Sequence, residues 1–255
     1  MSVDHYRVSP RDSLLAYLDV RALGSYPYRG SFELLKHEKR GMKIVELIDL
    51  LALHHRNSAI HTFEVSYLLA LLDPFGQIER GLMHDIGKTG IDPKLLDKRE
   101  GLTTEEKKQM SFHGPLGGAI LRRVGLGDLA FAAEEHHIGN SKNRIWTEQE
   151  LSSRHPATEA LSLADLICAA LDPRRSYRVP AERDTLLENI KLKTDIGIFS
   201  RELYQHFLDV IVANNIFPPF KLDDYQDTSF IKALKQLGIY DSFQDLIADD
   251  EAARL

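Results

Sequence analysis

The chain has 255 residues, of which 43% are hydrophobic and 27% are charged, and its formal net charge is −6. This length can bury a sizeable core, and the composition is ordinary for a globular protein. The negative charge argues against a general nucleic-acid or membrane-surface binder, although it permits a local basic pocket. Cys168 is the single cysteine, which excludes an internal disulfide and fits a reducing compartment.

The chain is expected to be cytoplasmic. Its first residues, MSVDHYRVSPRD, carry charges where a signal peptide has an apolar run. The longest apolar stretch, near YLLALL, is much shorter than a membrane span. We therefore expect no membrane partner.

Several signals mark where helices begin and end. GSYPYRGS at residues 24–31 is typical of a loop, and DPFG at 73–76 and DPRR at 172–175 are typical of turns after helices. Thr103 and Glu106 form a predicted capping box that opens a helix. Apolar residues recur at helical intervals between these signals, as in Val65, Leu68, Leu69 and Leu72.

The same patterns predict the fold class. Strict two-residue alternation is hard to find, so we predict an all-α fold. A helical body should span residues 51–213, with an N-terminal extension at 1–50 and a C-terminal extension at 214–255. Within the C-terminal extension, NIFPPFKLDD breaks the helical pattern before a predicted pair of short helices.

Some polar side chains fall on helical faces that should be apolar. His136, Asp165 and Asp85 each continue an apolar stripe, four or seven residues after a leucine or isoleucine. Burying a carboxylate there costs free energy unless a positive charge meets it, and either arginines or metal ions could supply that charge. Taken singly, a histidine on such a face is more often a hydrogen-bonded core residue, and an aspartate is as often a cap or an ion-pair member.

Seven histidines and aspartates, spread in order along the chain, together favour a metal centre. All are nitrogen or oxygen donors, which suits Fe or Mn ions, with Mg, Ni or Co as further options, better than a structural zinc site. Adjacent ligands on a helix point about 100° apart, so the pairs at 84–85 and 136–137 can address separate points of one cavity. Two ions about 3.5–4 Å apart can activate a water for phosphoryl displacement. The candidate ligands are His61, His84, Asp85, His113, His136, His137 and Asp165.

Six segments of the chain together carry a recognisable pattern. They are HTFEV (61–65), GLMHDIGKTGIDPKLLDKREGLTTEE (81–106), SFHGPLGGAIL (111–121), AAEEHH (132–137), LSLADLICAALDPRRSYR (161–178) and GIFSRELYQHFLDVI (197–211). These segments resemble the HD phosphohydrolase superfamily, and specifically its HD-GYP branch, the cyclic di-GMP phosphodiesterases. The likeness covers residues 57–213, and the combination is far more specific than any one segment. It implies a helical HD-GYP-like bundle around a binuclear divalent metal centre.

The resemblance also implies a role for individual residues. Asp85, as the bridging ligand, and Lys88, as a contact of the phosphate or of the attacking water, would be the catalytic residues. Arg174, Arg175 and Arg178 would contact substrate phosphate, and a solvated basic turn is the alternative interpretation for them. The ligands of the first ion would be His61, His84, Asp85 and Asp165. The ligands of the second would be Asp85, His113 and His136, with His137 at or beside it.

The sequence departs from the HD-GYP pattern in three places. Ile138 stands where the branch has a glutamate, and no Gly-Tyr-Pro follows the histidine pair. Asn57 stands where members with three metal ions carry a glutamate ligand, so we expect two ions. The short interval between His61 and His84 also leaves His54 and His55 as competitors for the place of His61.

The surroundings of the histidine pair can be predicted too. One ring nitrogen of His136 should bind metal while the other donates to an outer acceptor, for which Glu134 and Glu135 are candidates. The segment IGNSKNRIW at residues 138–146 should line the mouth of the cavity.

The resemblance implies a metal-dependent phosphodiesterase or phosphohydrolase that cleaves a nucleotide phosphoester through a metal-activated water. Cyclic di-GMP is the substrate of the family, and another nucleotide is the second option. A catalytically diverged signalling or nucleotide-sensing module remains the alternative, with a signalling protein or a second copy of the chain as a partner. A nuclease is disfavoured, because the acidic chain lacks a basic and aromatic stripe and no stable nucleic-acid binding is expected.

Overall fold

The computed structural model describes residues 39–73, 78–137, 147–153, 155–174 and 180–254, and these residues form helices and no strand. The predicted all-α fold is therefore confirmed. The helices that carry the site are α4 (Arg40–His54), α5 (Arg56–Leu72), α6 (Ile78–Met83), η1 (Ile86–Gly90), α8 (Thr104–Ser111), α9 (His113–Arg123), α10 (Ala130–Glu135) and α12 (Thr158–Leu171). The others are α7 (Pro93–Leu96), η2 (Gly127–Leu129), α11 (Glu148–Ser153), α13 (Arg183–Asp195), α14 (Arg201–Phe207), η3 (Leu208–Val212), η4 (Leu222–Asp224), α15 (Thr228–Leu237) and α16 (Tyr240–Arg254). Among these helices, none is long and apolar enough to cross a bilayer.

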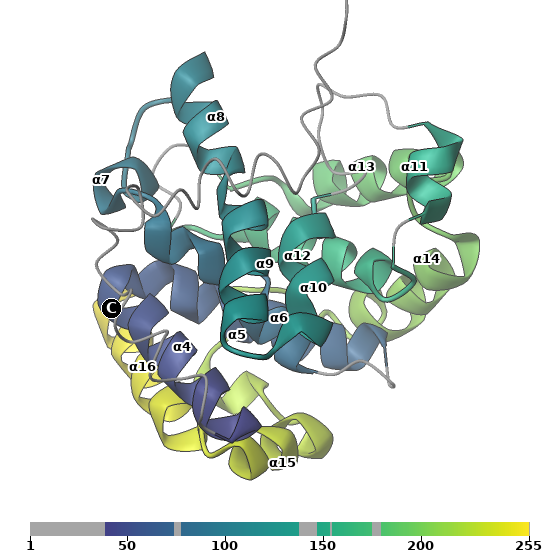
Figure 1. Ribbon diagram of the computed structural model, residues 1–255. Coiled ribbons are helices and arrows are strands. Elements are labelled where there is room, and N and C mark those ends of the chain that lie inside the picture. The colour runs from purple at the N-terminus through teal and green to yellow at the C-terminus, as the bar shows by residue number, and fades with distance from the viewer. Residues whose placement is uncertain (1–38, 74–77, 138–146, 154, 175–179, 255) are drawn as a thin grey trace, which may run out of the picture.

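Helix α5 forms the centre of the bundle (Figure 1). Every residue from Ser58 to Leu69 is buried, as expected for a helix that is covered on all sides. Helices α4, α6 and α12 pack directly on it, and α15 and α16 add further contacts. A polar residue on α5 is therefore enclosed by other helices and needs a partner inside the bundle.

One continuous core joins the predicted body and its extensions. Phe63 of α5 packs on Phe243 of α16 with their ring centroids 5.2 Å apart, and Tyr67 packs on Phe230 of α15 at 5.3 Å. The predicted boundary between residues 50 and 51 falls inside α4, whose Leu47 is fully buried in the same core. The described parts of both extensions therefore share the core of the helical body.

The predicted helix ends are borne out where the structure describes them. Thr103 caps α8, since its hydroxyl accepts from the backbone N–H of Glu106 at 3.3 Å and the Glu106 carboxylate accepts from the N–H of Thr103 at 2.7 Å. Asp73 and Asp172 follow directly on the last residues of α5 and α12. Residues 74–76 of the first predicted turn and residue 175 of the second lie outside the described residues.

Gly87 allows η1 to lie directly on the first turns of α9. A Cβ atom at this position would lie 1.8 Å from the carbonyl oxygen of His113 and 2.6 Å from the backbone nitrogen of Gly117. Only glycine permits this approach. The contact fixes Asp85, just before η1, relative to His113, the first residue of α9.

We expect Gly87→Ala to destabilise the protein by about 3 kcal/mol or more, because the clash is with backbone atoms that cannot rotate away. The exposed Gly101 is a matched control, since a Cβ there meets nothing within 4 Å. Gly101→Ala should change the free energy of unfolding by less than about 0.5 kcal/mol. Urea denaturation followed by circular dichroism measures both, and equal stability of the two variants would contradict the close packing.

Candidate metal centre

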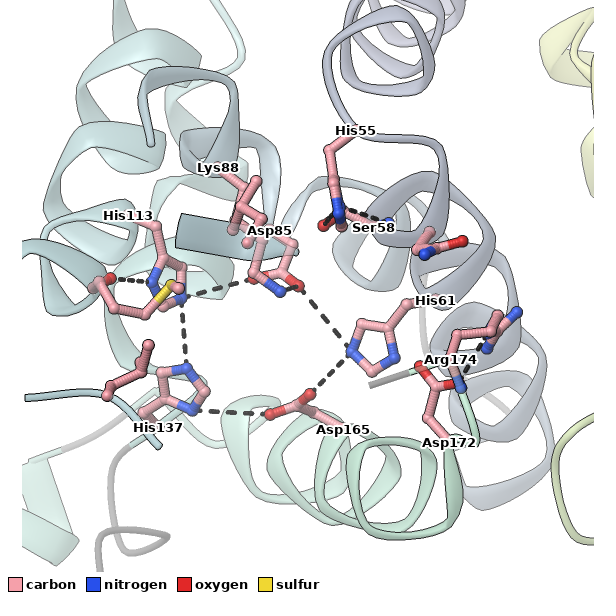
Figure 2. Close-up of a pocket in the computed structure, with 14 residues that line it drawn as sticks. His55, Ser58, His61, Asp85, Lys88, His113, His137, Asp165, Asp172 and Arg174 are labelled. Carbon is pink, nitrogen blue, oxygen red and sulfur yellow. Dashed lines mark hydrogen bonds and ion pairs between the residues drawn. The ribbon is translucent and has the colours of Figure 1, made fainter. Parts of the chain in front are cut away.

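The seven predicted ligands come together at one place in the bundle. We call His61 and His84 the first histidine group, and His113, His136 and His137 the second histidine group. Within each group, together with Asp85 for the first, the candidate ligand atoms lie within 4.8 Å of one another. Figure 2 shows Asp85 and Asp165 between the labelled members of the two groups.

The carboxylate of Asp85 presents one oxygen to each group. Its Oδ2 lies 3.3 Å from Nε2 of His84 and 3.8 Å from Nε2 of His61. Its Oδ1 lies 3.4 Å from Nε2 of His113 and 3.8 Å from Nε2 of His136. This is the arrangement of a bridging carboxylate, because each oxygen can serve a different ion.

Asp165 on α12 is the second carboxylate between the groups. Its Oδ1 lies 3.0 Å from Nε2 of His61 and 3.9 Å from Nε2 of His84, and its Oδ2 lies 3.6 Å from Nδ1 of His137. His137 is half-exposed, whereas the other candidate ligands are buried. Asp165 therefore belongs with the first histidine group, and His137 stands at the open side of the second.

Three of the histidines lie just beyond the end of a short helix and bond back to it. In His84, His113 and His136, Nδ1 lies 2.7, 2.6 and 2.8 Å from the carbonyl oxygen three residues earlier. These carbonyls belong to the last turns of α6, α8 and α10. Carbonyl oxygens in the last turn of a helix have no donor within that helix. Since a carbonyl only accepts, each Nδ1 carries a proton, and each ring turns its Nε2 toward the centre.

The prediction that Glu134 or Glu135 would be the outer partner of His136 is wrong, because the backbone carbonyls at the end of α10 take that place. Glu134 instead accepts two hydrogen bonds of 2.6 Å from Arg122. Glu135 accepts from the backbone N–H of His155 at 2.8 Å. Both carboxylates are thus engaged in hydrogen bonds at the end of α10, next to the histidine pair.

The converging imidazole nitrogens fit a cation. Nε2 of His113 lies 3.2 Å from Nε2 of His136 and 3.2 Å from Nε2 of His137. Two nitrogen ligands about 2.1 Å from one ion, at angles of about 90–109°, lie about 3.0–3.4 Å apart. In the first group, Nε2 of His84 is buried and forms no hydrogen bond with the described residues. Divalent ions would satisfy these nitrogens, so the donor set fits a binuclear centre.

Burial and neighbouring charges set the protonation of the centre. Burial lowers the pKa of His113 to about 4, and burial with the adjacent histidines holds the pKa of His136 well below its usual value. Burial would raise the pKa of Asp85, but Lys88 and His84 outweigh it and hold that pKa well below the usual range. Burial would lower the pKa of His84, but the carboxylate of Asp85 outweighs it and raises that pKa. Neutral imidazoles and ionised carboxylates are the forms that bind metal, so a metal ion would have to displace a proton from His84.

A cavity of about 160 Å³ opens beside the centre. Lys88 lines it and donates a hydrogen bond to Oδ2 of Asp85. Asn57 also lines the cavity. An apolar wall from α7, α8 and the loop between them faces these groups, formed by Leu96, Leu102 and Met110.

The competitors of His61 lie outside the ligand set. Nε2 of His54 bonds the carbonyl oxygen of Ile91 at 2.7 Å. His55 lines the cavity, but its ring nitrogens lie 2.7 Å from the hydroxyl oxygen of Ser58 and 3.1 Å from Oδ1 of Asp97. His61 is therefore the histidine of this segment that reaches Asp85 and Asp165.

Arg174 is not a solvated residue of a basic turn. Its side chain is 8% exposed and forms ion pairs with the carboxylates of Glu64, Asp172 and Asp250. It lines the cavity, but its charge is already met by these partners, so contact with substrate phosphate stays a prediction. Arg175, Arg178, Ile138 and the segment 138–146 lie outside the described residues.

Sequence reasoning missed the carboxylates around Arg174. Glu64 follows His61 by three residues and Asp172 follows Asp165 by seven, so each lies on the helical face of a predicted ligand. That spacing is a signal the sequence does contain. The contribution of Asp250, from a helix near the end of the chain, has no such signal.

No protein-family model matches the chain, and comparisons with curated proteins and with solved structures give no match.

Glu64 should make stability depend on pH. Its burial raises its pKa from 4.5 to about 7, against the opposing effect of Arg174. The folded state therefore holds this proton more tightly than the unfolded state, so the stabilisation is complete below about pH 4.5 and is lost as pH rises through about 7. Glu64→Gln should remove this loss, which amounts to a free energy of unfolding on the order of 3 kcal/mol.

Urea denaturation of the wild type and of Glu64→Gln between pH 5 and 8 measures the effect. The difference between the two proteins isolates Glu64, since the other groups titrate in both. Parallel pH dependences would contradict the raised pKa.

Proposed function

We propose that the chain is a metal-dependent phosphohydrolase of the HD type that cleaves a phosphoester bond of a nucleotide. The observation that carries this proposal is the position of Asp85, with one oxygen toward each histidine group. The HD motif at residues 84–85 and the five other candidate ligands support it further. Cyclic di-GMP is the first substrate to test, and other nucleotides come next.

The proposed ligands divide as the distances suggest. His61, His84 and Asp165 would hold one ion, and the second histidine group would hold the other, with Asp85 shared between them. Two such ions, when bound, would supply the activation of a water and the stabilisation of phosphoryl oxygens that in-line displacement requires. Fe and Mn suit a donor set of imidazole and carboxylate better than Mg, which prefers oxygen alone.

Lys88 would complete the chemistry at the phosphate. It lies one turn after Asp85 on η1, and its side chain is 14% exposed at the cavity. The ammonium group can turn from Asp85 to a phosphoryl oxygen bound beside it. A fixed positive charge at that point lowers the energy of the transition state as negative charge grows on the phosphoryl group.

The rest of the cavity suits a nucleotide. Leu96, Leu102 and Met110 offer an apolar wall for the face of a base, and Asn57 offers an amide donor and acceptor for its edge. The proposal therefore places the phosphate at the histidines and the nucleoside toward α7 and α8.

Asp85→Asn tests the centre with little change of shape. We expect at most one bound ion and no hydrolysis above background, because an amide cannot bridge two cations as a carboxylate does. Elemental analysis gives the metal content, and chromatography of cyclic dinucleotides and nucleoside monophosphates after incubation gives the activity. Asp97→Asn is the matched control, since Asp97 is 64% exposed, and it should keep both ions and full activity.

Full metal content in Asp85→Asn would show that Asp85 is only the ion-pair partner of Lys88. Wild-type protein that binds two ions but cleaves none of these phosphoesters would contradict the hydrolase and favour the nucleotide-sensing module.

Lys88→Met should separate chemistry from metal binding. We expect kcat to fall by about 10²–10³-fold, the usual loss for one group that stabilises charge in the transition state. The metal content should stay at the wild-type value, because Lys88 is not a ligand. Steady-state kinetics and elemental analysis of the same preparation test both statements, and an unchanged kcat would remove Lys88 from the mechanism.

A further inference from the structure

A buried ion-pair cluster lies next to the metal centre. We call it the Arg174 cluster and define it as Glu64, Asp172, Arg174 and Asp250. Nε of Arg174 donates to Oδ1 of Asp172 at 2.6 Å, Nη1 donates to Oδ2 of Asp250 at 3.2 Å, and Nη2 donates to Oε2 of Glu64. All four side chains are at most 8% exposed. One guanidinium group thus holds three carboxylates.

The cluster joins the helices that carry the first histidine group and its carboxylate. Glu64 lies on α5, three residues after His61, and Asp172 follows the last residue of α12, seven residues after Asp165. Asp250 comes from α16, where Arg254 also pairs with it. Arg174 therefore links α5 and α12, the helices whose His61 and Asp165 meet at 3.0 Å, and ties both to the C-terminal helix.

His61 separates the cluster from the centre. Figure 2 shows Asp172 and Arg174 on the side of the His61 ring that faces away from Asp85. Burial would raise the pKa of Asp172, but Arg174 and the nearby His61 outweigh it and lower that pKa. Asp172 is thus an ionised carboxylate near a candidate metal ligand, and the cluster reaches His61 through α5 and α12, the helices that it links.

A role in folding alone explains this cluster poorly. A protein is often as stable, or more stable, with well-packed apolar residues in place of a buried ion pair, because desolvation of the charges offsets their attraction. The unpaired Oε1 of Glu64 adds to the cost, since it is buried and accepts no hydrogen bond from the described residues. The cluster borders the cavity through Asp172 and Arg174, where it can act on the site.

We propose that the Arg174 cluster is a positioning device for the first metal ion, in which Asp250 of α16 fixes Arg174, Arg174 fixes Asp172, and this arrangement holds His61 against Asp165. The inference rests on the binuclear centre of the proposed function and adds the C-terminal helix to it. Asp250 and Arg174 act here as positioning residues and touch neither the metal nor the substrate.

The test is a Mn²⁺ titration of the full-length apo-protein by calorimetry. We expect the wild type to bind two ions. Asp250→Asn should keep one ion at wild-type affinity and bind the other about 10-fold more weakly, the lower end of the loss for a group that orients a ligand, because Asp250 acts through Arg174. Electron paramagnetic resonance provides a second readout. In Asp250→Asn, the signal of two coupled Mn²⁺ ions should disappear at metal concentrations that still saturate the unaffected site of the second histidine group.

Asp249→Asn is the matched control. Asp249 precedes Asp250 on the same helix, but it is 68% exposed and pairs with Arg56 at 2.9 Å. It should bind both ions as the wild type does. Asp250→Glu, which restores the charge, should recover much of the lost affinity. Circular dichroism establishes that each variant is folded, and if Asp250→Asn does not fold, Asp172→Asn decides by the same criterion.

Two results would overturn the inference. Folded Asp250→Asn that binds both ions at wild-type affinity would show that the cluster does not act on the centre. Equal weakening of both ions would show a general effect on stability and no specific effect on the first group. Wild-type protein that binds no ion would instead contradict the proposed function itself.

Discussion

The burial of the Asp85 carboxylate is the constraint around which the rest of the site is arranged. A charge with 2% exposure is tolerable only if opposite charge or hydrogen-bond donors surround it. Lys88 supplies one positive charge, and the histidine nitrogens around both oxygens are lone-pair donors that call for cations. A bound metal ion would meet both the carboxylate and these nitrogens. Gly87 then sets how closely η1, and with it Asp85, can approach α9.

Short helices are what make this arrangement possible. Each of α6, α8 and α10 ends one or two residues before a candidate ligand, and the carbonyl oxygens of its last turn have no partner within the helix itself. The ring of His84, His113 or His136 satisfies one of these oxygens through Nδ1 and thereby points Nε2 at the centre. The same hydrogen bond ends a helix and fixes a tautomer. A longer helix would satisfy the carbonyl itself and leave the ring free to rotate.

The features that depend on local periodicity could be predicted from the sequence. An all-α fold, the Thr103 cap and the buried positions of Asp85, His136 and Asp165 follow from spacing along the chain, whereas the roles of the other ligands were implied by the resemblance to a known family. The outer partner of His136 could not be predicted in this way, because side-chain chemistry pointed to Glu134 or Glu135 while the free carbonyls depend on where α10 ends. The complete set of Arg174 partners was also beyond reach, since Asp250 lies 76 residues away in the chain and no local spacing indicates it.

These long-range pairs change how the chain divides. A helical body ending at residue 213 would exclude Asp250, whose carboxylate meets Arg174, and Phe243, which packs on Phe63 of α5. Helix α5 carries both His61, which faces the candidate metal centre, and Glu64, which belongs to the Arg174 cluster. A shift of this helix would therefore move both residues together. A change in α16 can reach His61 through Arg174 and through the aromatic core. The C-terminal segment is therefore part of the structure around the candidate site, because Asp250 pairs with Arg174 and Phe243 packs on α5.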